Sequence, residues 1–358
     1  MSITEKLDSW QQRRPGLGIP LAVLYKFFDD QGGYLAALIA HYAFVSIFPL
    51  LLLFTTILGF VLNGHPHLQQ QVINSALGQF PIIGQQLHSS AHSLTGSGVA
   101  LIIGILGSLY GGIGIAQSLQ NSLNKIWAVP RQARPNPFKS RLRSLGLLVV
   151  LGVGVIATTL MSGITTGSGA LNLNLGPISR IFAIVVSVIV DMAIFLAAFK
   201  VLNARELTWR QVAVGALIAA VGWEVLQLVG TYFVAHKLHG ASQVYGLFGL
   251  VLGLLALLGL EALVVVFAAE INVVRIDALY PRSLLTPFTD NVALTSADRR
   301  AYTSYAKTER YKGFERVDVS YGTGPKGQQE EPAGDGPGPE APVNGGLDAT
   351  GSRSEPAP

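Results

Sequence analysis

Long apolar runs separated by short polar loops dominate the chain between residues 32 and 275. The two clearest runs, 211–235 and 247–271, would each be about 37 Å long as a helix at roughly 1.5 Å per residue. That length crosses a hydrocarbon core of about 30 Å with some tilt. Similar apolar runs lie near 34–62, 98–119, 144–163 and 180–200. The pattern predicts an all-α, polytopic integral membrane protein with a six-helix transmembrane bundle.

The chain on either side of these runs is polar. Residues 1–31 form an amphipathic segment in which the apolar side chains share one helical face, while Lys26, Asp29 and Asp30 lie elsewhere. We expect this segment to be a short helix that lies in the membrane interface or caps the bundle as a solvated helix. Residues 276–358 form a tail that is rich in Gly, Pro and Glu, and we expect it to be disordered from about 320.

The basic residues predict the orientation of the bundle. Of the Lys and Arg residues, 23 fall in the segments predicted for one side of the membrane, and two fall on the other side. The basic segments are 1–31, 120–143, 200–210 and the tail from 272. Because cytoplasmic loops carry the excess of Lys and Arg, we expect both termini to be cytoplasmic.

The composition supports a membrane protein and excludes some chemistry. Only 13% of residues are charged, whereas soluble domains average about 25%. There is no cysteine, so the chain has no disulfide or thiolate chemistry. The net charge of +4 follows the predicted topology, and we expect no nucleic-acid partner. The basic loop at 125–143 is instead expected to contact anionic lipid head groups, at about 1 kcal/mol per basic residue.

Three acids lie near the centres of the last three predicted spans: Asp191, Glu224 and Glu261. A charge at that depth costs roughly 2.5–3.5 kcal/mol, and these spans hold no Lys or Arg away from their ends. The acids must therefore be protonated, hydrogen-bonded, hydrated or bound to a cation. Gln227 shares a helical face with Glu224. The pattern indicates a proton-binding or cation-binding site or the lining of a substrate path; the alternative is protonated acids that hydrogen-bond neighbouring helices.

Two further ionisable residues are candidates for the same interior. His41 lies one or two turns inside the first predicted span and could titrate near neutral pH, or it could be a packing residue. Glu270 lies near the cytoplasmic end of the sixth span, where Arg275 five residues later could pair with it. A structural role is the simpler interpretation of both.

Catalytic and cofactor motifs are missing from the sequence. It contains no GxxxxGK[ST], no HExxH and no GxSxG, so we expect no ATP-hydrolysing module, no catalytic metal and no serine nucleophile. His88 and His92 have a spacing that could ligate a metal, but their loop offers no Asp, Glu or Cys. We therefore expect no cofactor and no enzymatic activity.

Small residues in the second and fifth spans occur at helix-packing positions. Gly107 and Gly111 form a GxxxG pair, and Gly215 lies in a similar setting. Such residues let two helix backbones approach closely. We expect them to pack helices of the same chain rather than to form a dimer.

Four stretches resemble, in the same order, helices and a loop of the YihY/virulence factor BrkB family, whose members were formerly labelled ribonuclease BN. These stretches are Leu35–Phe54 with Ser46 and Pro49, Asn121–Arg131 with Asn124 and Trp127, Trp209–Phe233 with Gly215, and Val244–Asn272 with Glu270 and Asn272. The chain departs from the family pattern at Glu261, where members often carry Trp. The resemblance implies a six-span protein of the bacterial plasma (inner) membrane. A nuclease is not expected, because the cytoplasmic loops between 120 and 211 hold a single acid, Glu206.

Taken together, the residues favour a transporter or lipid-handling protein with a polar site between the fourth, fifth and sixth spans. The alternative is a non-transporting scaffold for envelope assembly, in which the tail and cytoplasmic loops matter more than the buried acids. Either interpretation is compatible with a homo-oligomer or an envelope protein partner.

Overall fold

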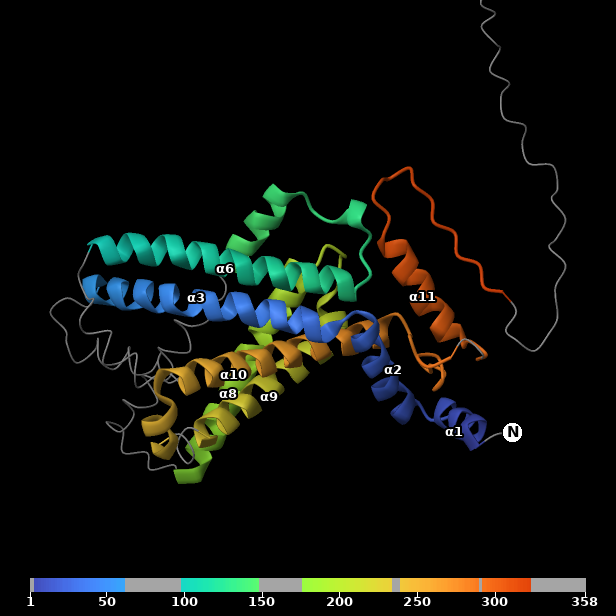
Figure 1. The fold of residues 1–358 in the computed structure, drawn as a ribbon, viewed down its shortest axis with the longest axis horizontal. Coiled ribbons are helices and arrows are strands. Elements are labelled where there is room, and N and C mark those ends of the chain that lie inside the picture. Colours follow the sequence, from blue (N-terminus) through green and yellow to red (C-terminus); the bar gives the residue numbers. More distant parts are fainter. Residues whose placement is uncertain (1–2, 62–97, 148–175, 234–238, 290–291, 323–358) are drawn as a thin grey trace, which may run out of the picture. The chain divides into compact units, whose positions relative to one another are not determined.

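The structure is a computed structural model that describes residues 3–61, 98–147, 176–233, 239–289 and 292–322. The chain divides into two compact units, Met1–Ser320 and Tyr321–Pro358, and almost all of the second lies outside the described residues. The regular elements of the described residues are all helices, which confirms the predicted all-α fold (Figure 1). They are α1 (Ile3–Gln12), α2 (Pro15–Asp29), α3 (Gly32–Val61), α6 (Gly98–Ile126), the 3-10 helix η1 (Arg131–Ala133), α8 (Gly176–Leu202), α9 (Trp209–Phe233), α10 (His239–Ile276) and α11 (Ser296–Thr308). A further helix begins at 137 and continues to the end of its described stretch at 147.

Three helices in the described residues are long and apolar enough to cross a bilayer. They contain the segments Ile184–Leu202, Trp209–Gly230 and Val251–Ile276. α3 and α6, at 30 and 29 residues, occupy the positions of the first two predicted spans. The third predicted span, 144–163, lies mostly outside the described residues. The count of six spans and the side of each terminus therefore stay predictions.

α3 and α6 lie side by side, and glycine makes this approach possible (Figure 1). A Cβ atom on Gly111 would lie 2.3 Å from the Cβ of Ser46, and one on Gly107 would lie 2.7 Å from the Cβ of Pro49. Any larger side chain would push the two backbones apart. The prediction that these glycines pack helices of the same chain is confirmed.

α10 is the helix that connects the bundle, since it packs against α9, α3 and α2. Its contact with α9 includes a buried amide. The backbone N–H of Gly215 donates to Asn272 Oδ1 at 2.8 Å, and Asn272 Nδ2 donates to the carbonyl of Val212 at 3.2 Å. A Cβ on Gly215 would lie 2.2 Å from Asn272 Nδ2, so glycine is what makes room for this amide.

The four basic segments meet at one end of Met1–Ser320. The bonds that join them are Lys26 Nζ to the Ile126 carbonyl at 2.8 Å, Ala204 N–H to Asn124 Oδ1 at 2.9 Å, and Arg205 to both Asp277 oxygens at 2.9 Å. Tyr25 also donates to the Leu284 carbonyl at 2.8 Å. The positive-inside pattern requires these segments to lie on the same side of a membrane, and this arrangement meets that requirement.

Candidate functional site: two groups of buried charges

The first group is a carboxyl pair between α8 and α9. Asp191 lies near the middle of α8 and Glu224 near the middle of α9, and their carboxyls lie close enough to interact. Both residues are half-buried. Phe195, one turn from Asp191, packs edge-on against Trp223 with ring centroids 6.2 Å apart. Two neighbouring carboxyls repel each other when both are ionised, and a proton on either one removes that repulsion.

Glu261 does not join this pair. It is 6% exposed on α10, and among the described residues burial alone acts on its carboxyl, with no charged neighbour. The structure thus brings together two of the three acids that the sequence singled out. Gln227 is half-buried one turn beyond Glu224 on α9. His41 is exposed on α3 and contacts the ring of Tyr42, with centroids 5.6 Å apart.

The second group lies where α2 meets α6 and α10. Lys26 of α2 is 1% exposed, Asp30 is 3% exposed and Glu270 of α10 is fully buried. Lys26 forms a salt bridge with Asp30, and its Nζ lies 3.6 Å from Glu270 Oε2. The stacked rings of Phe27 and Phe267, 4.2 Å apart, close one side of this cluster.

This arrangement corrects two expectations. We expected Arg275 as a partner for Glu270, but within the described residues the salt bridge of Glu270 is to Lys26, and Arg275 is exposed. We also expected Lys26 and Asp30 to lie away from the buried face of their helix. Both are buried where the carboxylate of Glu270, 244 residues further along the chain than Lys26, faces the Lys26 ammonium. A local helical pattern carries no information about such a partner.

An ion pair beside this cluster anchors α11. Arg282, 1% exposed, donates from Nε to Asp298, which is fully buried. Asp298 also accepts the backbone N–H of Ser283 at 3.1 Å and that of Thr295 at 3.0 Å. It is the N3 residue of a capping box whose N-cap is Thr295. Arg282 reaches Asp29 at 3.2 Å, which ties α11 to the end of α2.

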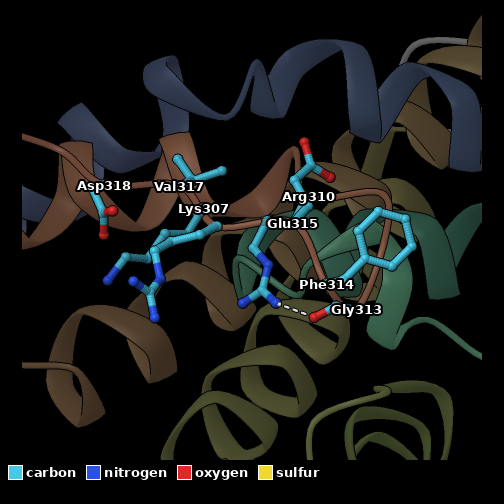
Figure 2. Close-up of a pocket in the computed structure, with 8 residues that line it drawn as sticks. Lys307, Arg310, Gly313, Phe314, Glu315, Val317 and Asp318 are labelled. Atoms are coloured by element: carbon cyan, nitrogen blue, oxygen red, sulfur yellow. Dashed lines mark hydrogen bonds between the residues drawn. The ribbon is translucent and has the colours of Figure 1, made fainter. Parts of the chain in front are cut away.

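A surface hollow lies at the end of α11, and its lining brings together no side chains from different parts of the described chain. Arg310 donates to the Gly313 carbonyl at 3.2 Å across it, as Figure 2 shows. Its lining residues come from one stretch of the chain: Lys307, Arg310, Gly313, Phe314, Glu315, Arg316, Val317 and Asp318. No group of three or more potential metal-ligating side chains is found within the described residues. The loop with His88 and His92 lies outside them.

Comparison with known proteins agrees with the membrane architecture. The family described as Virulence factor BrkB matches residues 23–286. The chain is 25% identical over 274 residues to the inner membrane protein YhjD of Escherichia coli (strain K12), which covers 72% of this chain and 81% of the relative. It is 27% identical over 263 residues to an uncharacterised protein of Dickeya dadantii (strain 3937), covering 68% and 79%. No solved structure matches the chain.

The family match spans most of the chain, from α2 through all three helices that are long and apolar enough to cross a bilayer. It includes both groups of acidic residues, whereas Asp298 of the neighbouring ion pair lies beyond the matched residues. The resemblance seen in the sequence is therefore confirmed. The chain belongs to the BrkB virulence factor family and is a multi-pass protein of the bacterial inner membrane.

Proposed function

We propose that the protein is a transporter rather than an enzyme, and that it binds a proton or a monovalent cation on the Asp191–Glu224 pair. The observation that carries this proposal is the contact between these two carboxyls halfway along two apolar helices. Acids at such positions are costly and usually mark ion or substrate pathways. A purely structural pair is the competing explanation, and it predicts that neutral amides would serve equally well.

The surroundings of the pair support a binding role. Both carboxyls are half-buried, and binding of an ion requires that their exposed side face a water-filled path in the membrane. Within the described residues no Lys or Arg is among the groups that act on Asp191, so a bound cation or proton is what would balance the negative charge. Glu261, buried elsewhere on α10, is not among the groups that act on Asp191, so it does not compete for the ion.

The test is charge displacement on a solid-supported membrane. Proteoliposomes are exposed to a rapid step in pH or, separately, in Na⁺ concentration, and the transient current is recorded. We expect a transient in at least one arm for the unmodified protein and a loss of at least tenfold in Asp191→Asn and Glu224→Gln. Glu206→Gln, which neutralises an exposed acid in the loop before α9, is the matched control and keeps the transient. Failure to see a transient, or equal transients in all variants, rejects the proposal.

A further inference from the structure

We propose that Lys26, Asp30 and Glu270 form a proton-binding site that holds α2 against α10, and that loss of the proton weakens this joint. The site is separate from the Asp191–Glu224 pair and does not rest on its role in transport. It would make the position of an amphipathic helix at the basic end of the bundle depend on pH.

The geometry places three ionisable groups from two helices in one buried volume. Lys26 Nζ contacts the Asp30 carboxylate, donates to the Ile126 carbonyl at 2.8 Å and lies 3.6 Å from Glu270 Oε2. The exposed fractions are 1% for Lys26, 3% for Asp30 and 0% for Glu270. α2, α6 and α10 each contribute a partner, so the joint exists only while α2 is docked.

The charges of this site do not balance when both acids are ionised. One ammonium then faces two carboxylates, which leaves one buried negative charge. Neither Glu270 oxygen has a hydrogen-bond donor within the described residues. The Asp30 and Glu270 carboxyls lie in contact with each other. A single proton on either one supplies the missing donor and makes the site neutral, which removes the cost of burying an unpaired charge.

The electrostatics of the α2 residues agree with this. Burial raises the pKa of Asp30 above its ordinary value, although Lys26 acts in the opposite direction. Burial lowers the pKa of Lys26, but attraction to Glu270 and Asp30 outweighs burial and leaves it above its ordinary value. Lys26 therefore stays charged, and the proton that the site exchanges belongs to the two carboxyls.

The neighbouring ionisable groups leave this balance unchanged. Asp29 is occupied by Arg282 at 3.2 Å and by the Tyr305 hydroxyl at 3.2 Å. Burial, with Asp30 and Asp29 nearby, raises the pKa of Tyr305, so its phenol stays neutral beside Lys26. Lys125 of α6 donates to the Gln31 side chain at 3.3 Å in an exposed bond. Lys125 also attracts the Asp30 carboxylate, but less strongly than Lys26 does.

The direction of the pH effect follows from linkage. An undocked carboxyl has a pKa near 4, whereas the docked site holds its proton to higher pH. The docked state then binds more protons than the undocked state at every pH between these two values. Docking of α2 is therefore strongest near pH 4. It weakens as the pH rises through the pKa of the docked site.

The absence of native cysteine makes a direct distance measurement possible. Spin labels on Leu24→Cys of α2 and Arg275→Cys of α10, both exposed, report the distance between the two helices in lipid nanodiscs. We expect one distance at about pH 5 and a second, longer distance at about pH 8.5. In Glu270→Gln, which mimics the protonated acid, we expect the pH 5 distribution at both values. Asp30→Asn is the alternative variant, with the same expected result, if Glu270→Gln does not fold into the membrane.

Two controls assign the effect to this site. A label pair on Leu217→Cys of α9 and Ala256→Cys of α10, both exposed, should show no change with pH, because the contact between α9 and α10 does not involve α2. Asp191→Asn should leave the α2–α10 shift intact, which separates this site from the proposed transport site. The proposal is overturned if the unmodified distances are the same at both pH values, or if Glu270→Gln and Asp30→Asn shift as much as the unmodified protein.

Discussion

Asp298→Ala should release α11 from the bundle while leaving the membrane helices in place. Asp298 is fully buried and is the partner that pairs with Arg282 Nε. It also accepts the Ser283 and Thr295 backbone N–H groups and completes the capping box of α11. Alanine removes all of these acceptors at once and, within the described residues, leaves the buried guanidinium with Asp29, at 3.2 Å, as its one ion-pair partner.

The size of the effect follows from these contacts. Breaking a buried ion pair by removing one partner costs about 3–5 kcal/mol, because the remaining charge is uncompensated. Loss of the helix cap adds about 1 kcal/mol. The contact of Arg282 with Asp29 recovers part of this cost, so we expect a net loss of about 3–5 kcal/mol in the free energy of local opening. At 1.4 kcal/mol per tenfold, that is a rise of between about 150-fold and several thousand-fold in the open population.

Hydrogen exchange followed by mass spectrometry measures this opening directly. Peptides that cover α11 should exchange faster by that factor, whereas peptides from α9 and α10 should not change. Glu309→Ala is the matched control, because its ion pair with Arg131 at 2.9 Å is exposed and should contribute nothing measurable. If α11 in Asp298→Ala exchanges within tenfold of the unmodified protein, the buried pair does not hold this helix and the reasoning is wrong.

Two further predictions concern packing and lipid. Gly111→Ala should lower the stability of the bundle by about 1–3 kcal/mol, because its new methyl group would meet Ser46. Gly259→Ala is the control and should not lower the stability, because a Cβ atom there would have nothing within 4 Å. Thermal unfolding in detergent measures both variants. Lys139→Glu combined with Arg141→Glu should weaken binding of anionic phospholipid and leave binding of zwitterionic lipid unaffected, as measured by native mass spectrometry. Both residues are exposed in the basic segment 125–143, near the start of the helix that begins at 137. Unchanged binding of anionic lipid by the variant would contradict this.

Apolar length was a sufficient signal for the long helices that the structure describes, but it gave no indication of the polar helix α11. The runs near 180–200 and 211–235 correspond to α8 and α9 within a few residues at each end. α10 extends beyond its predicted span of 247–271 at both ends, from His239 to Ile276. Hydropathy marks where a helix is apolar, and it does not mark where a helix with polar ends continues past the membrane.

The side-chain contacts were harder to predict, because they depend on which helices are neighbours. The carboxyls of Asp191 and Glu224 could be expected to meet, since both lie mid-helix in consecutive spans. Glu261 fits the same rule, yet neither Asp191 nor Glu224 is among the groups that act on it. For Lys26 no sequence signal was available, because its partner Glu270 lies near the other end of the residues that match the family, 23–286. Only the packing of α2 on α10 brings them together.

The two groups of buried charges share a property that makes them separable by experiment. Each holds more acid than base: no cation acts on Asp191 within the described residues, and one ammonium faces Asp30 and Glu270. Each group can therefore take up a proton. The pH dependence of the whole protein would be the combined result of protonation at the two groups. Glu270→Gln removes an acid from the joint of α2, and Asp191→Asn removes one from the interior pair. Since the two groups share no described contact, the effects of Glu270→Gln and Asp191→Asn on the pH dependence of the protein should add. Any departure from additivity in the double variant would measure how strongly the position of α2 is coupled to the Asp191–Glu224 pair.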